Sequence, residues 1–207
     1  MKDLSLLAKL LAEEDIHVVH RQQQTAMFDV LNRELSLPIW KDMSKNIQDL
    51  MTLHEVGHAL WTPLEMMDKV KEQKISFSVV NVLEDVRIEK AIQLKYRGAI
   101  KIFNKGYQEL IHSNFFETIG KDIKNYNLID RINLHYKHHI DVPFSDDEMV
   151  WVKKANETVT SDDVIELAKE LIDFIEENKE SQGKDTDTDD LVMPEMGKES
   201  MGTESLS

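Results

Sequence analysis

Between Ile47 and Leu60, apolar residues recur at offsets of three and four, which is the spacing of one face of an α-helix. Ser44 stands at the expected N-cap, and Pro63 predicts that the helix ends soon after Leu60. The side chains on one side of this helix are Ile47, Leu50, Met51, His54 and His58. The pattern therefore predicts a helix with two histidines on its apolar side.

The segment from His54 to His58 reads His-Glu-Val-Gly-His, so the two histidines are one helical turn apart. This spacing lets both imidazoles bind one zinc ion (Zn²⁺), while Glu55 stays off the metal and polarises a water molecule. The competing interpretation is a helix with two hydrogen-bonded core histidines and a surface glutamate. Gly57 counts against it, because glycine costs about 1 kcal/mol relative to alanine in a helix interior and usually has a packing reason.

A tetrahedral zinc site needs a third protein ligand. Two adjacent carboxylates, Glu84 and Asp85, are candidates, and Glu84 lies 26 residues beyond His58. The stretch 79–92 is apolar nearly all round, which predicts a largely buried helix. Carboxylates in such a helix are costly unless they are paired or bound to metal. Arg87 can pair with Glu84, but we expect Glu84 to be the third ligand and Asp85 to be the alternative.

Two segments, His54–Pro63 and Asn81–Glu89, resemble the zincin-type metallopeptidase region of tailed-phage peptidase proteins. Related regions precede von Willebrand A domains in some bacterial proteins. The segment Asp29–Ser44 is similar to the part of that group that stands ahead of the helix. The resemblance covers about residues 11–110. It implies a zinc-dependent peptidase fold and no particular substrate.

The chain departs from the broader glutamate-zincin pattern at one position. In that pattern an aspartate commonly follows the ligand glutamate by one helical turn, whereas Ile88 stands four residues after Glu84 here. The alternative register, Asp85 with Glu89 one turn later, keeps a carboxylate at that place. This register keeps Asp85 close behind Glu84 as a candidate ligand.

Composition suits one globular domain: the chain has 207 residues, of which 41% are hydrophobic. We expect residues 1–177 to form an α+β, mostly helical, zincin-like domain with a small sheet beside the His-Glu-x-x-His helix. The absence of cysteine excludes disulfides and thiolate metal sites and is compatible with the cytoplasm, the host cytoplasm if the chain is phage-encoded. Residues 1–12 are too short and too charged to span a membrane. A net charge of −14 disfavours nucleic-acid binding.

The acidity is concentrated in residues 178–207, which contain three lysines and eight acidic residues. The part from 181 to 190 has no apolar residue, so we expect an acidic disordered tail that can contact a protein partner. Calcium binding by the alternating aspartates is the competing interpretation. It is disfavoured because the glycine and the distal glutamate of a calcium loop are missing.

Short strands are predicted at 17–20, 25–30 and 34–40, and the edge of such a sheet can pair with an extended peptide. Helices are predicted at 2–14, 98–114, 121–140 and 161–179, the last capped by Thr160 or Ser161. The cluster His135, His138 and His139 can bind metal or can be a solvated helix end, and we favour the solvated end.

These residues together predict a zinc-dependent metallopeptidase acting on a peptide or protein substrate. His54, His58 and Glu84 hold the zinc, and Glu55 takes a proton from water and passes it to the leaving amine. The alternative is a non-catalytic zincin-like zinc-binding module that acts as a phage structural or regulatory interaction protein.

Overall fold

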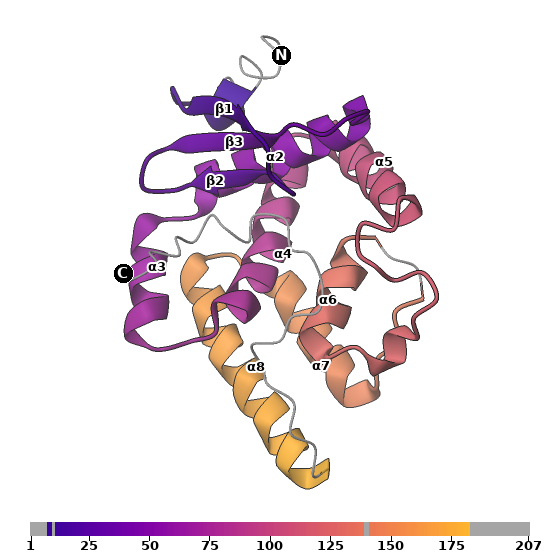
Figure 1. Ribbon diagram of the computed structural model, residues 1–207. Coiled ribbons are helices and arrows are strands. Elements are labelled where there is room, and N and C mark those ends of the chain that lie inside the picture. Colours follow the sequence, from indigo (N-terminus) through magenta and orange to yellow (C-terminus); the bar gives the residue numbers. More distant parts are fainter. Residues whose placement is uncertain (1–7, 10, 139–140, 183–207) are drawn as a thin grey trace.

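The computed structural model describes residues 8–9, 11–138 and 141–182, and it is mostly helical with one small sheet (Figure 1). The strands are β1 (His17–Arg21), β2 (Met27–Asp29) and β3 (Glu34–Pro38). The helices are α2 (Lys45–Trp61), α3 (Leu64–Glu72), α4 (Phe77–Lys95), α5 (Ala99–His112), the 3-10 helix η1 (Ile123–Asn125), α6 (Leu128–Tyr136), α7 (Asp146–Glu157) and α8 (Ser161–Gln182). The α+β class with three short strands is confirmed.

The sheet has the strand order β1-β3-β2, with β1 parallel and β2 antiparallel to the central β3. It lies at one end of the molecule, beside α2 (Figure 1). Phe28 and Leu35 from the sheet share a hydrophobic cluster with Leu50 of α2. Arg33, between β2 and β3, donates a hydrogen bond of 2.6 Å to the carbonyl of Ala59. The sheet thus packs against α2 and is hydrogen-bonded to its second half, which carries the two histidines.

Local signals set the ends of α2 as the sequence predicts. The Ser44 hydroxyl accepts a hydrogen bond of 3.1 Å from the Ile47 backbone N–H, and the helix ends at Trp61, two residues before Pro63. The cap of α8 is also confirmed, because Thr160 Oγ1 accepts from the Asp163 backbone N–H at 3.1 Å.

Other boundaries differ from the prediction. Helices α3 and α7 were not expected, and the predicted helix 121–140 is divided into η1 and α6, because Asn127 caps α6 through the Asp130 backbone N–H. Helix α8 continues to Gln182, beyond the boundary expected at residue 177. Of the predicted helix 2–14, residues 8–9 and 11–12 are described and helical. The remainder of the acidic tail, 183–207, lies outside the described residues.

Helices α4 and α5 both approach α2 closely, and each contact is made at a glycine. A Cβ atom added to Gly57 would lie 2.8 Å from Ile88 Cδ1 of α4, and one added to Gly106 of α5 would lie 2.6 Å from Leu50 Cβ. Both distances are shorter than real Cβ contacts, so each glycine permits the approach of two helices. The packing reason expected for Gly57 is confirmed.

Helix α4 contributes residues to two hydrophobic clusters. One joins the sheet, α2 and α5, and the other joins α4 with α6, α7 and α8. Buried residues follow one another on α4 from Val79 to Glu89, as the apolar stretch predicts. Within the described part of the chain, no helix is long and apolar enough to cross a membrane.

Candidate metal centre

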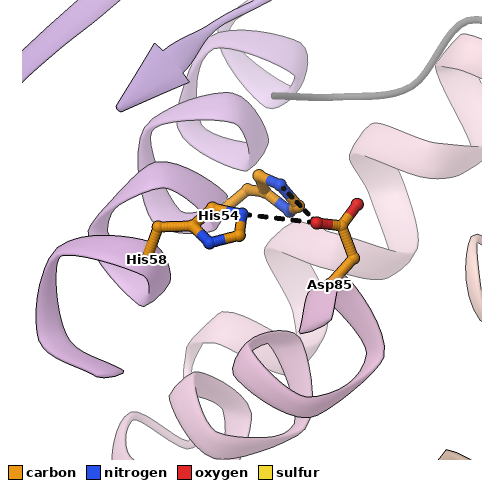
Figure 2. Close-up of side chains that lie close together, drawn as sticks. All are labelled: His54, His58 and Asp85. Atoms are coloured by element: carbon orange, nitrogen blue, oxygen red, sulfur yellow. Dashed lines mark ion pairs between the residues drawn. The ribbon is translucent and has the colours of Figure 1, made fainter. Parts of the chain in front are cut away.

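Helices α2 and α4 bring three potential metal ligands together. His54 and His58 project from α2 toward Asp85 on α4 (Figure 2). Asp85 Oδ1 lies 3.5 Å from His54 Nε2 and 3.3 Å from His58 Nε2. The three donor atoms all lie within 4.8 Å of one another, and the side chains are between 0% and 2% exposed.

Three buried atoms, His54 Nε2, His58 Nε2 and Asp85 Oδ1, make no hydrogen bond in the described part of the chain, and the Asp85 oxygen lies at ion-pair distance from both nitrogens. The other nitrogen of each imidazole is engaged. His54 Nδ1 lies 2.8 Å from Glu89 Oε1, and His58 Nδ1 lies 2.9 Å from Thr62 Oγ1. Each ring is therefore oriented through Nδ1 and presents Nε2 to the shared space. Carboxylates and hydroxyls commonly orient metal-binding histidines in this way.

The donor set fits zinc. Ligands about 2.0–2.2 Å from a tetrahedral zinc ion are about 3.3–3.6 Å from one another. The two distances from Asp85 Oδ1 to the imidazoles, 3.5 Å and 3.3 Å, match this spacing. Two imidazole nitrogens and one carboxylate oxygen also form a three-ligand set that leaves a fourth position for another molecule. Among the described residues, this is the one group of three or more such side chains that could hold a metal ion.

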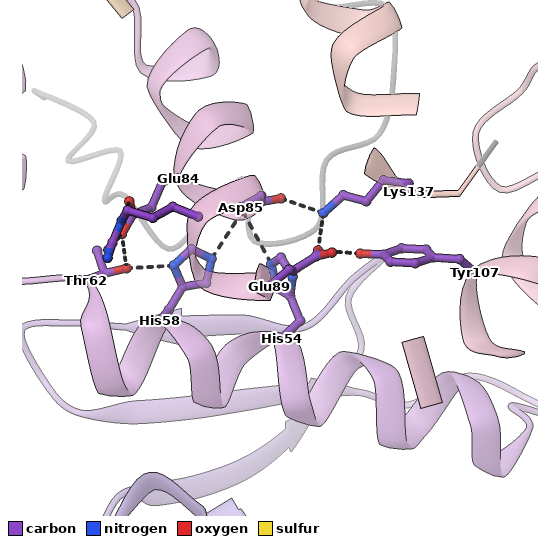
Figure 3. Close-up of polar contacts among 9 residues, drawn as sticks. His54, His58, Thr62, Glu84, Asp85, Glu89, Tyr107 and Lys137 are labelled. Atoms are coloured by element: carbon purple, nitrogen blue, oxygen red, sulfur yellow. Dashed lines mark hydrogen bonds and ion pairs between the residues drawn. The ribbon is translucent and has the colours of Figure 1, made fainter. Parts of the chain in front are cut away.

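Glu84, the expected third ligand, lies elsewhere. Its carboxylate accepts hydrogen bonds from Arg87 Nε at 2.8 Å and from Thr62 Oγ1 at 2.6 Å (Figure 3). Adjacent residues on a helix point in directions about 100° apart, so one of the pair Glu84 and Asp85 faces the two histidines. That residue is Asp85, and the geometry thus favours the alternative ligand over the first choice.

The register of Asp85 with Glu89 also explains the missing carboxylate one turn after Glu84. Glu89 lies one turn beyond Asp85 on α4 and contacts Nδ1 of His54. Glu84 supports the other histidine indirectly, because Thr62 lies between His58 Nδ1 and the Glu84 carboxylate. Glu89 therefore orients one imidazole directly, and Glu84 orients the other through Thr62.

Glu55 is fully buried, and neither of its carboxylate oxygens has a hydrogen-bond partner. Burial raises the pKa of Glu55 above its ordinary value, and the neighbouring His54 and His58 only partly oppose this. Glu55 thus lies next to the two histidines without a hydrogen bond, and its expected role as general base stays a prediction.

Three polar residues meet at the Oε1 atom of Glu89. It accepts from Lys137 Nζ and from the Tyr107 hydroxyl, in addition to its contact with His54 (Figure 3). Lys137 Nζ also donates to Asp85 Oδ2 at 2.9 Å. Burial alone would raise the pKa of Asp85 and of Glu89, but Lys137 and His54 hold both below their ordinary values.

Lys137 and Thr62 were not found from the sequence. Lys137 belongs to a distant segment without a recognisable spacing, but Thr62 is four residues after His58 on the same helical face and could have been found. The histidine cluster near the end of α6 forms no metal group among the described residues: His135 and His138 are exposed, and His139 lies outside the described part.

Comparisons with protein-family models, with curated proteins and with solved structures find no match to this chain. The resemblance to phage zincin-type peptidases stays a prediction that rests on the residues of the motif.

Proposed function

We propose that the protein is a zinc-dependent metallopeptidase whose metal ligands are His54, His58 and Asp85. The observation that carries this proposal is the convergence of three buried donor atoms without hydrogen-bond partners, next to a glutamate that also has none. Burying polar atoms without hydrogen bonds costs about 1–3 kcal/mol each, and the ion-pair contacts of Asp85 with the two imidazoles offset only part of this cost. Such a cost concentrated in one place is expected where a bound ion satisfies the atoms.

Bound zinc supplies Lewis acidity, which makes water a nucleophile near neutral pH and polarises a peptide carbonyl. The chain supplies the proton transfer: Glu55 accepts a proton from the attacking water and delivers it to the leaving amine. Glu89 and Thr62 keep the two imidazoles in place. Glu55 is not needed as a ligand, so its presence beside the ligands supports catalysis over simple metal storage.

The position of the sheet supports a zincin-like arrangement and a peptide or protein as substrate. Strands β1 and β2 form the two edges of the sheet, which lies beside the helix that carries His54 and His58. An extended peptide can add to a sheet edge through backbone hydrogen bonds. We propose that the substrate backbone is aligned in this way relative to α2.

One observation favours a second candidate, a non-catalytic zinc-binding module with a structural or regulatory role. The ligands and Glu55 are almost completely buried. A cavity of about 320 Å³ beside α4 includes Glu89 and Tyr136 in its lining but none of the three ligands. A zinc ion with a structural role would join α2 to α4. A zinc ion with a catalytic role would require the chain around Glu55 to open, so that a substrate can enter.

Cleavage of a mixed peptide library, read by mass spectrometry, separates the two candidates. The wild type should bind one zinc ion and cut peptides, and a chelator should stop the cutting. Glu55→Gln should keep zinc and lose about 10²–10⁴-fold in rate, because the general base is removed. The matched control is Glu65→Gln, at an exposed glutamate in the first turn of α3, which should cut like the wild type.

Each contrary result has a definite meaning. A wild type that holds a full equivalent of zinc and cuts no peptide supports the binding module. Cleavage that survives Glu55→Gln points to a contaminating protease. A wild type that binds no zinc after reconstitution rejects the metal centre itself.

A further inference from the structure

Lys137 is a buried lysine whose ammonium contacts two carboxylates of the candidate metal centre. It is the C-cap residue of α6, and its side chain is 2% exposed. Nζ lies 2.9 Å from Asp85 Oδ2 and 2.5 Å from Glu89 Oε1, and 5.4 Å from the centre of the Tyr107 ring (Figure 3). The lysine thus joins α6 to the two carboxylates that α4 directs at the histidines.

A buried ammonium costs several kcal/mol unless it is paired, and a simple ion pair between α6 and α4 would meet that need. Neutralising the ammonium of Lys137 does not require the particular oxygen atoms that it contacts. Asp85 uses Oδ2 for Lys137 and leaves Oδ1 facing the imidazoles, while Glu89 uses one oxygen for both Lys137 and His54 Nδ1. Both contacts of the ammonium therefore set the orientation of groups at the centre.

We propose that Lys137 is a positioning residue of the metal centre. By holding Oδ2, it makes Asp85 offer Oδ1 alone to the ion. By holding Glu89, it keeps His54 turned with Nε2 toward the ion. This role rests on the proposed metal centre and extends it to a residue on a third helix.

Position and charge have opposite effects on metal affinity, which makes the proposal testable. A positive charge near a divalent cation weakens binding, so removal of the charge alone would tighten it. Removal of the positioning contact frees both oxygens of Asp85 and releases Glu89, which weakens binding. Loss of a group that orients a ligand typically costs 10–100-fold in metal affinity.

The experiment is a titration with cobalt(II), a coloured substitute for zinc, of the wild type, Lys137→Met and Lys137→Arg. The control is Arg131→Met: Arg131 is on the same helix α6 and pairs with Glu148, away from the centre. We expect Lys137→Met to bind cobalt about 10–100-fold more weakly. Its visible absorption should also be weaker, because Asp85 can then bind through both oxygens and raise the coordination number. Lys137→Arg, which keeps a cationic donor, should recover part of both, and Arg131→Met should match the wild type.

A second measurement needs no variant and therefore does not depend on the folding of Lys137→Met. X-ray absorption at the zinc edge of the wild type should show Asp85 bound through one oxygen, at about 2.0–2.2 Å. A carboxylate bound through both oxygens would overturn the proposal. So would a Lys137→Met protein that folds without metal and binds cobalt as tightly as the wild type, or more tightly.

These outcomes separate the role of Lys137 from the proposed function. Normal cobalt binding by Lys137→Met, in a protein whose wild type binds cobalt, overturns the positioning role alone. A wild type that binds no cobalt and no zinc overturns the metal centre and this role together. Peptide cleavage is not needed for either decision.

Discussion

Asp85 Oδ1 lies 3.3 Å from His58 Nε2, across the contact between α4 and α2. The neighbouring carboxylate, Glu84, instead pairs with Arg87. Two adjacent carboxylates on one buried helix thus have different roles, one facing the imidazoles and the other neutralising a buried guanidinium. This division leads to different consequences when either residue is made neutral.

Asp85→Asn should strip zinc from the protein, whereas Glu84→Gln should keep it and lose stability. The amide oxygen of asparagine is a neutral donor and a poorer zinc ligand than a carboxylate. Glu84→Gln leaves Arg87 buried without its counter-charge, and breaking a buried pair costs about 3–5 kcal/mol. Zinc content by elemental analysis and unfolding by denaturant measure the two effects. Zinc retention by Asp85→Asn together with zinc loss in Glu84→Gln would restore Glu84 as the ligand.

Thr62→Val should weaken zinc binding about 10–100-fold with little change in shape. The hydroxyl of Thr62 orients His58 through Nδ1, and loss of such a contact typically has this effect on metal affinity. Thr52→Val is the matched control, because Thr52 is also buried, on α2, but its hydroxyl donates to the carbonyl of Gln48. Competition with a chelator of known affinity gives both constants. Equal zinc affinity of the two variants would remove Thr62 from the centre.

Local signals account for the part of the site that could be predicted from the sequence. The cap at Ser44, the stop before Pro63 and the histidine spacing all act within a few residues, and the structure keeps them. Gly57 indicates a close neighbour without identifying it. The capping box of Ser145 and Glu148 at the start of α7 was equally local and was missed.

The third ligand and its support depend on tertiary packing. Helix α4 is buried nearly all round, so its sequence has no polar face that sets which side meets α2. In the structure Ile88 packs at Gly57, and with α4 in this rotation Asp85 rather than Glu84 faces the histidines. Lys137 comes from a helix far along the chain, and no spacing predicts its contact with Asp85.

In the metal-free protein, the titratable groups of this centre should contribute most to the free energy of unfolding at mildly acidic pH. The pKa values of Asp85 and Glu89 lie below their ordinary 3.8 and 4.5, so their contribution is full above about 4.5 and is lost as pH falls. The pKa values of Glu55 and His58 are raised above 4.5 and 6.5, so their contribution is full below those values and is lost as pH rises.

Denaturant unfolding in the presence of a chelator, from pH 3 to pH 8, measures this profile. Glu55→Gln removes the group whose contribution is lost above pH 4.5, so the decline of stability on the neutral side should become shallower. Zinc should reverse the trend, because it binds neutral imidazoles and its affinity rises with pH. A Glu55→Gln profile parallel to that of the wild type would show that ionisation of Glu55 does not contribute to the pH dependence of stability.

Gly57→Ala and Ile88→Val should interact strongly in a double-mutant cycle. The alanine Cβ would lie 2.8 Å from Ile88 Cδ1, and overpacking of this kind costs about 1–3 kcal/mol. The better helix propensity of alanine returns about 1 kcal/mol. Ile88→Val alone costs about 0.5–1.5 kcal/mol, but it removes Cδ1 and leaves the nearest Ile88 atoms at 3.4 and 3.5 Å. The double variant should therefore be about 1–2 kcal/mol more stable than additivity gives.

Gly106→Ala is the control for this cycle, because its added Cβ would meet Leu50 Cβ at 2.6 Å and the backbone oxygen of Asn46 at 3.0 Å. Trimming Ile88 cannot relieve these contacts, so Gly106→Ala combined with Ile88→Val should be additive within about 0.5 kcal/mol. Gly106→Ala should also cost more than Gly57→Ala, since a Cβ and a backbone atom move less easily than a terminal methyl group. Free energies from denaturant unfolding decide both points. Additivity for the Gly57 pair would mean that Ile88 Cδ1 does not limit how closely α4 approaches α2 at this glycine.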